Sequence, residues 1–363
     1  MDIYDTLYML AAVEQLDPEP NFFKRRYFPT NTDLDVFGTS KVLADYKEGN
    51  HKAAPFVMPR IGALPVGRDG FSTYELEPAN ISISKPLTID QLNRRGFGES
   101  LMSQATPAER ARRLLMGDLS DLSARITRTE EWLSCDTMLN NGTVMRHQSD
   151  DPDVYEDVPV KFYEGSNNPG AFTPQNAWTH STKAATGIIT RGNWYEDICA
   201  MIKLLVQRGR PATDLVVAND VGNFLQEDPW VVEMMDNRRA EYGAINPEAL
   251  TPYVTSLGRY NFGGRSLNIL VNDGTFEDEK GVEKPFLADG SVIVTAPNCG
   301  RGLYGAVTQK EMDNQWHTYA GMRVPNHIST IVPPMDETVV SARPLYVPNT
   351  TTPWIAAKNV FKK

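Results

Sequence analysis

Residues 106–142 read TPAERARRLLMGDLSDLSARITRTEEWLSCDTMLNNG and predict one long helix. Thr106 is a favourable N-cap residue, Pro107 suits the first helical position, and Glu109 completes a capping box. Asn141 tolerates the left-handed backbone that ends many helices, and Gly142 follows it. Apolar side chains recur along one face at Leu115, Leu119, Leu122, Ile126 and Leu133. We therefore expect a helix over 106–141 that packs against a core, with a coiled-coil dimer seam as the alternative.

The stretch between Leu16 and Thr106 predicts no helix, because prolines and glycines interrupt it throughout. Structureless segments of this length are uncommon inside compact domains. This one is nevertheless rich in apolar residues, namely Phe22, Phe23, Tyr27, Phe28, Phe37, Phe56, Val57, Phe71, Tyr74, Ile81 and Ile83. A segment that cannot form its own core must bury such groups elsewhere. We expect it to dock on neighbouring copies of the same chain.

The composition is that of a soluble globular protein: of 363 residues, 41% are hydrophobic and 23% are charged. The net charge of −10 argues against tight, sequence-independent binding to nucleic acid. Cys135, Cys199 and Cys299 have no metal-ligand spacing and predict buried free thiols. The N-terminus lacks the basic region of a signal peptide, and the longest apolar run, 198–206, is too short to span a bilayer. We expect an intracellular protein without membrane contact.

Several shorter elements can be placed around the long helix. Residues 4–15 predict a short amphipathic helix, and 53–85 predict an extended two-stranded excursion with a glycine-rich tip. A self-sufficient α/β lobe is expected over about 190–325. In it, 194–208 form a helix, 214–218 form a buried strand, and Asp220 caps the next helix. Strand character at 265–271, 291–295 and 303–308 completes this lobe. The strand expected at 337–347 should return to the long helix and close a second lobe.

No catalytic constellation is apparent. Residues 300–305 read GRGLYG, a formal G-x-G-x-x-G, but they are followed by strand character where dinucleotide binding needs a helix. A bulge or tight turn is the preferred interpretation, with a nucleotide-binding α/β enzyme as the alternative. The five histidines have no metal-binding spacing, and the acidic run 150–153 lacks the rest of an EF-hand loop. We expect no enzyme activity, cofactor or metal.

The order of these elements resembles the HK97-type α+β fold of tailed-phage capsids. Short motifs narrow the resemblance to the lambda-type major capsid protein E family: LAAVEQ at 10–15, FFKRRYF at 22–28, RDGF at 68–71, and Arg301-Gly302 with Tyr304-Gly305. The similarity runs from about residue 8 to about residue 347. By position it implies an N-terminal arm (1–50), an E-loop (51–95), a P-domain (96–190) with a spine helix over 106–141, an A-domain (191–325), and a C-terminal return to the P-domain (326–363).

The resemblance implies a protein that self-assembles into hexamers and pentamers of an icosahedral phage head enclosing packaged dsDNA. Its expected partners are a portal, a scaffold or assembly chaperone, and a decoration protein. Localisation would be the virion, with assembly in the host cytoplasm. An encapsulin-type compartment shell is the alternative within the same fold. The residues expected at the assembly interface are Phe22, Phe23, Arg25, Arg26, Tyr27, Phe28, Arg60, Arg68, Asp69 and Phe71.

Overall fold

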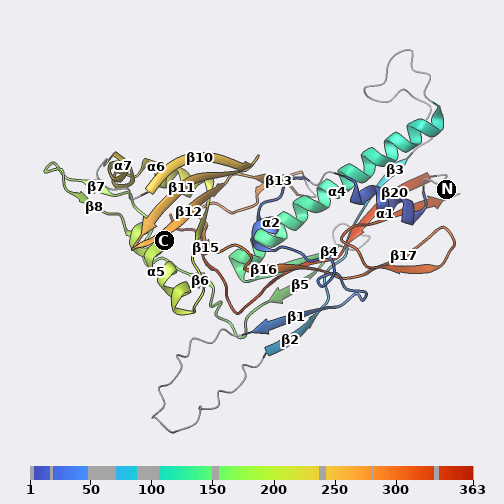
Figure 1. The fold of residues 1–363 in the computed structure, drawn as a ribbon, viewed down its shortest axis with the longest axis horizontal. Helices are drawn as coiled ribbons and strands as arrows, with labels where there is room; N and C mark the ends of the chain where they lie inside the picture. The colour runs from blue at the N-terminus through green and yellow to red at the C-terminus, as the bar shows by residue number, and fades with distance from the viewer. Residues whose placement is uncertain are drawn as a thin grey trace, which may run out of the picture.

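A computed structural model describes residues 4–16, 19–47, 71–87, 106–148, 155–236, 243–278, 281–330 and 335–362. In Figure 1 the molecule is elongated, and α4 (Pro107–Asn140) runs from the central region to one end. One lobe is built on a seven-stranded sheet. The other contains smaller sheets, together with α1 (Thr6–Glu14) and the outer part of α4. Within these ranges, no helix is both long and apolar enough to cross a membrane.

The long helix begins and ends as its sequence predicts. The Thr106 hydroxyl accepts a hydrogen bond from the Glu109 amide at 3.3 Å, and the Glu109 carboxylate accepts one from the Thr106 amide at 2.8 Å. At the other end, Asn141 has a left-handed backbone with φ of 50°. The buried stripe formed by Leu115, Leu119, Leu122 and Ile126 packs on Met9 of α1 and on Val340 and Ala342. Because this stripe is covered within its own chain, the coiled-coil alternative is wrong.

The seven-stranded sheet has the order β10-β11-β12-β9-β15-β22-β6. Its strands are β10 (Gly243–Thr251), β11 (Val254–Phe262), β12 (Arg265–Asn272), β9 (Asp214–Ala218), β15 (Val292–Thr295), β22 (Ile355–Ala357) and β6 (Ala171–Phe172). The central strand β9 is buried along its whole length, which confirms the predicted strand at 214–218. Strand β22 lies in this sheet, so the expectation that all of 326–363 returns to the lobe of the long helix is wrong for these residues.

Both faces of this sheet are covered, because alternate residues of a strand point to opposite sides. Leu215 and Val217 pack with α5 (Asn193–Gln207) and α6 (Asn219–Glu227), beside which lies α7 (Pro229–Asp236). Val216 and Ala218 pack instead with aromatic residues of the N-terminal segment and with the last turns of α4. Asp220 is not the N-cap residue, because Ala218 occupies that position. The Asp220 carboxylate nevertheless accepts from the Val221 amide in the first turn of α6 at 2.8 Å, and also from the Gly290 amide at 2.7 Å.

The second lobe contains a three-stranded sheet, β19-β20-β3, formed by β19 (Val324–Thr330), β20 (Met335–Ala342) and β3 (Ile81–Leu87). The strand expected at 337–347 does return to α4, but it divides into β20 and β21 (Pro344–Pro348). Strand β21 pairs with β16 (Gly300–Tyr304). The strand expected at 303–308 is likewise divided, between β16 and β17 (Val307–Lys310), and β17 forms a hairpin with β18 (Trp316–Tyr319).

The remaining elements are short pairs. They are β1 (Val42–Lys47) with β2 (Phe71–Leu76), β4 (Gly142–Gln148) with β5 (Tyr155–Lys161), β7 (Thr182–Lys183) with β8 (Ile189–Thr190), and β13 (Thr275–Glu277) with β14 (Glu283–Pro285). The predicted excursion over 53–85 is not one ribbon, because β2 pairs with β1 whereas β3 pairs with β20. Its rising strand and tip lie outside the described residues. The stretch expected to lack helices contains a five-residue helix, α2 (Phe23–Tyr27).

Candidate functional site

The site that organises the molecule is the junction at which α2 lies between α4 and the seven-stranded sheet. Phe22, Phe23, Tyr27 and Phe28 are all buried there. The Phe28 ring packs edge-on against Tyr346 and Trp354, with ring centroids 5.4 and 5.7 Å apart. These four aromatic residues were expected to dock on another copy of the chain. The structure corrects this: their apolar surface is covered within the same chain, so it is not available to a neighbour.

Glu131 of α4 holds the start of α2. Its carboxylate accepts hydrogen bonds from the backbone amides of Phe22 and Phe23, both at 2.7 Å, and of Lys24 at 3.1 Å. These amides belong to the first turn of a helix and have no partner inside it. A negative group is also favourable at this end of a helix dipole. Burial raises the pKa of Glu131, and the three amide donors counteract that rise. The Glu131 side chain thereby fixes the first turn of this five-residue helix to α4.

Glu130, the preceding residue, is the centre of a buried ion cluster. It accepts from the Lys24 ammonium at 2.7 Å, from both terminal nitrogens of Arg323 at 2.7 Å, and from the Tyr304 hydroxyl at 2.8 Å. Burial alone would raise the pKa of Glu130, but Arg323 and Lys24 outweigh that effect and lower the pKa to about 2. The cluster joins α2, α4, β16 and the segment before β19. A fully buried carboxylate is tolerated because two cations and a hydroxyl satisfy it.

Asp214, the first residue of β9, ties the other side of α2 to the sheet. Its carboxylate accepts from Arg26 Nε at 2.7 Å, from the Tyr27 hydroxyl at 3.1 Å and from the Asn268 side chain at 3.0 Å. Arg26 was expected at an assembly interface; its Nε is bonded to Asp214 within the chain, and its side chain remains 31% exposed. Three carboxylates, two on α4 and one on β9, therefore clamp α2 between the two lobes.

The glycine motif at 300–305 also serves this junction. Gly300 and Gly302 lie in β16, where the N-terminal segment crosses the strand. A Cβ atom at Gly300 would collide with the Phe28 ring and lie 2.7 Å from the Val347 carbonyl; one at Gly302 would lie 2.6 Å from Thr30 Oγ1. The glycines therefore permit close approach of the segment. No helix begins at the motif, so the dinucleotide interpretation is wrong, and the preferred bulge or tight turn is replaced by a regular strand.

The other residues expected at the interface are scattered. Arg25 is exposed on α2, and Phe71 is paired with Lys47 at the end of β2. Arg60, Arg68 and Asp69 lie outside the described residues.

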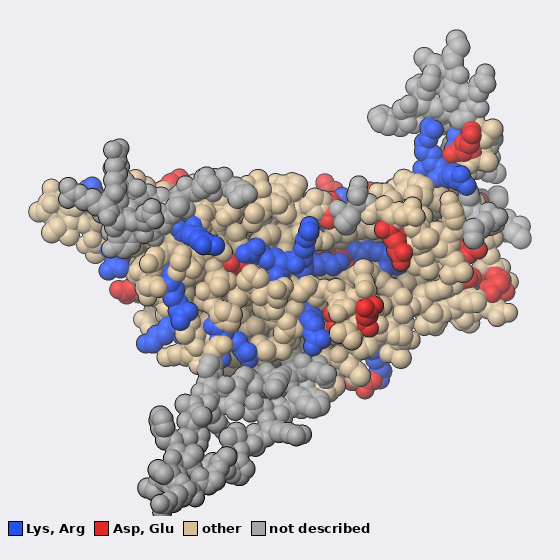
Figure 2. Space-filling model, viewed as in Figure 1, with Lys and Arg blue, Asp and Glu red and all other residues tan. Residues whose placement is uncertain are grey.

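Figure 2 shows that Lys and Arg side chains form a band across one face of the molecule, although the net charge of the chain is −10. The cysteines are free, as expected; Cys135 and Cys299 are buried, whereas Cys199 is only half-buried. Burial raises the pKa of Cys299 to about 12. A thiol buried in this way is unreactive.

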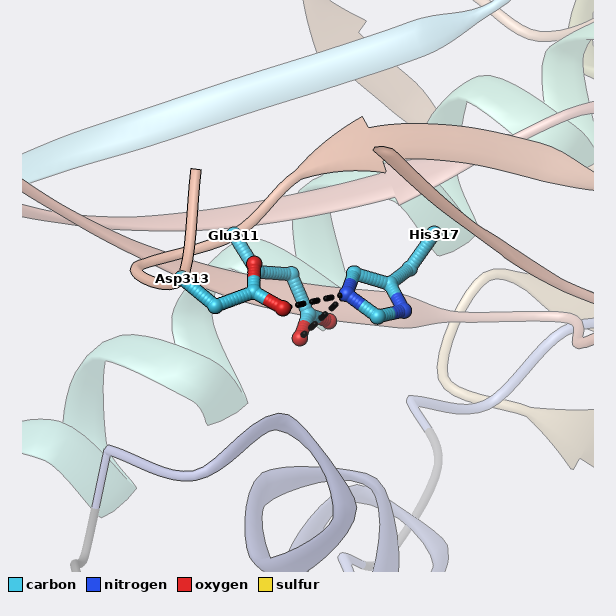
Figure 3. Close-up of side chains that lie close together, drawn as sticks. All are labelled: Glu311, Asp313 and His317. Carbon is cyan, nitrogen blue, oxygen red and sulfur yellow. Dashed lines mark hydrogen bonds and ion pairs between the residues drawn. The ribbon is translucent and has the colours of Figure 1, made fainter. Parts of the chain in front are cut away.

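A second polar cluster lies at the turn between β17 and β18, where Glu311, Asp313 and His317 converge (Figure 3). His317 Nε2 is 2.8 Å from one Asp313 oxygen and 3.9 Å from Glu311. The other Asp313 oxygen accepts from the Gln315 amide at 2.9 Å. The nearest ligand atoms lie within 4.8 Å of one another, but Asp313 is engaged in closing the turn. We assign this cluster a structural role in the hairpin.

The hydrogen bond to Asp313 raises the pKa of His317, so Asp313→Asn should lower that pKa toward 6.5. In the wild type, the pairing of protonated His317 with Asp313 stabilises the hairpin fully below pH about 6.5. This stabilisation is lost as the pH rises through the raised pKa of His317 in the folded chain. Titration of the histidine ring protons by NMR measures this. Glu311→Gln is the matched control. It should lower the pKa of His317 by less, because Glu311 lies 3.9 Å from His317 Nε2 whereas Asp313 lies 2.8 Å from it. A pKa of His317 unchanged in Asp313→Asn would contradict the assignment.

The polar groups of the junction bind segments of the chain to one another. A crystal structure described as a prophage capsid protein from E. coli CFT073 has a TM-score of 0.66 at 16% identity, covering 97% of this chain and 98% of that one. The chain therefore has the HK97-like α+β fold of capsid proteins.

The family described as Phage major capsid protein E matches residues 5–359, and the chain belongs to that family. The major capsid protein of Escherichia phage lambda is 23% identical over 350 residues, covering 95% of this chain and 96% of the relative. That of Escherichia phage N15 is 22% identical over 350 residues, with the same coverage. The chain is a major capsid protein of a tailed phage and a component of the virion. The family is structural, so the enzyme and encapsulin alternatives are not supported.

Proposed function

We propose that this chain builds the hexamers and pentamers of an icosahedral head that encloses packaged dsDNA. The observation that carries the proposal is the clamped junction at α2. Glu130, Glu131 and Asp214 fix one short helix to both lobes. Each subunit can therefore enter a shell as one rigid body. The net charge of −10 favours a shell that does not adhere to the polyanion inside it.

The regions implied by the family resemblance remain our proposal, with two amendments. Residues 1–50 are the N-terminal arm, 51–95 the E-loop, 96–190 the P-domain, 191–325 the A-domain, and 326–363 the return to the P-domain. The first amendment is that β6 and β22 belong to the A-domain sheet, and the second is that β16, β17 and β18 lie in the other lobe, where β16 pairs with β21 and β17 bonds to β19. We further propose assembly in the host cytoplasm, with a portal, a scaffold or assembly chaperone, and a decoration protein as partners.

Replacing residues 48–70 by Asn-Gly tests the proposed E-loop without disturbing the fold. Lys47 and Phe71 are directly paired at the ends of β1 and β2, and a two-residue Asn-Gly turn can close such a pair. Deleting all of 51–95 would be less informative, because it would also remove β2 and β3. The shortened chain is expected to be soluble and to melt like the wild type, but to build no shells in negative-stain electron microscopy.

A finer variant keeps the segment and replaces Arg60, Arg68 and Asp69 by alanine. It should reduce the yield of shells without changing the melting temperature, if these residues contact neighbouring subunits as proposed. Normal shells from the Asn-Gly variant would refute the role of the segment. Normal shells from the triple alanine variant alone would refute only the choice of residues.

A further inference from the structure

The β17–β18 hairpin is attached to the molecule by one face only. It is a two-stranded sheet that pairs with no other strand in the described part of the chain. On its inner side Val307 and Gln309 are buried, and the Gln309 side chain donates to the Pro325 carbonyl of β19 at 3.1 Å. The Asn326 side chain in turn donates to the Lys310 carbonyl at 3.0 Å. Ribbons of two strands are at best marginally stable in water unless a face is packed.

The outer face of the hairpin is open and carries a large aromatic side chain. Its exposed residues are Thr308, Lys310, Trp316 and Thr318, which lie on one side because Thr308 pairs with Thr318 and Lys310 with Trp316. Trp316 is 72% exposed, more than any other large apolar side chain among the described residues, and Met312 in the turn is 61% exposed. Single exposed apolar residues are ordinary, but a tryptophan and a methionine on one small hairpin form an unusual surface.

The end of the molecule that bears this hairpin carries further apolar groups. Figure 1 places α1, β20 and β17 together at that end. Leu7 of α1 is 64% exposed, and Ile328 of β19, the neighbour of β20 in the sheet, is 41% exposed. Tryptophan and methionine are enriched at protein interfaces, and tryptophan is a frequent energetic centre of them. This end therefore has the composition of a contact surface.

Charges of both signs also occur at this end. Glu311 and Asp313 lie in the turn of the hairpin, whereas Arg112 and Arg113 are exposed near the start of α4. Figure 2 shows basic side chains gathered at that end of the helix. Identical copies related by a rotation can then place acidic groups of one against basic groups of the next, rather than like against like.

We propose that the outer face of the β17–β18 hairpin, centred on Trp316 and Met312, docks on the hairpin end of a second copy of this chain. The inference rests on the proposed function, because a closed shell of identical subunits supplies the second copy. In the assembled shell, Trp316 is covered by a neighbour and ceases to be a solvent-exposed side chain.

Hydroxyl-radical footprinting with mass spectrometry tests this directly. The probe reacts with exposed Trp and Met side chains in the purified, unassembled chain and in shells made from this chain alone, with a free dosimeter equalising the radical dose. Oxidation of Trp316 and Met312 should fall several-fold in shells. If both residues react equally in the two states, the inference is overturned while the proposed function stands, and a partner other than this chain would then be the occupant. If the wild-type chain builds no shells even with its scaffold or assembly chaperone present, both fail.

Two substitutions give an independent test. Trp316→Ser should abolish or strongly reduce shell formation while leaving the melting temperature of the unassembled chain close to that of the wild type, since the side chain is 72% exposed in its own subunit. Trp316→Phe, which keeps an aromatic group, should restore most of the shell yield. Shells formed by Trp316→Ser at the wild-type yield would overturn the inference.

Discussion

The double variant L119D/L122D is expected not to fold. Both leucines are buried in the apolar cluster formed by α4, α1 and β20. Each aspartate would be a buried, unpaired carboxylate, which costs several kcal/mol. The total stability of a domain is about 5–15 kcal/mol, so two such substitutions exceed what the fold can tolerate. The soluble fraction, size-exclusion profile and thermal circular-dichroism transition measure the outcome.

Ser120→Asp is the matched control, because Ser120 lies between the two leucines on the exposed side of α4. It should fold and melt close to the wild type, since surface substitutions change stability by about 0.5 kcal/mol or less. A soluble double variant with a cooperative transition would contradict the packing of α4 described above.

The second large effect is expected at Glu130. In Glu130→Gln the shape of the side chain is retained, but Lys24 and Arg323 are left buried without a counter-charge. Removing one partner of a buried ion cluster costs about 3–5 kcal/mol. Urea unfolding followed by tryptophan fluorescence measures the loss. The control replaces all three residues by methionine, which removes the unpaired charges together and should recover much of the stability.

Glu130 also makes the stability of the folded chain depend on pH, with stability falling as the solution becomes more acidic. Its pKa is lowered from 4.5 to about 2 in the folded chain, so it contributes stability above pH 4.5 that is lost as the pH falls toward 2. Two to three pKa units correspond to on the order of 3 kcal/mol. The wild type should therefore lose stability over this range faster than Glu130→Gln. Equal slopes in the two proteins would show that the carboxylate is not paired as described.

The parts of the fold that the sequence predicted are those set by neighbouring residues. Thr106, Glu109 and Asn141 determine the ends of α4 locally, and the run at 214–218 is apolar enough to identify a buried strand. Strand pairing was not predictable in the same way. The segment at 355–357 reads as a short apolar run, and nothing close to it in sequence indicates that it pairs with β15 rather than near α4.

The junction was missed for a related reason. The aromatic block at 22–28 showed that it must be buried, but composition cannot tell an intramolecular partner from a second copy. Glu130 and Glu131 lie on a helix that is rich in charge, where a carboxylate is expected to face solvent. The only hint was the basic run Lys24-Arg25-Arg26, which needs counter-charges. The expectation that this block docks on a second copy is therefore wrong, and the chain is identified as a capsid protein by its fold and its family.

The clamp around α2 also orders events during synthesis. Residues 23–28 leave the ribosome before the groups that hold them, since Glu130, Asp214, Arg323 (through Glu130) and Trp354 follow one by one. A nascent or prematurely terminated product cannot complete these contacts around α2, because Arg323 and Trp354 are missing from it. A chain therefore acquires the rigid body that a lattice can accept only after residue 354 has been made, so folding itself keeps shorter products out of the shell.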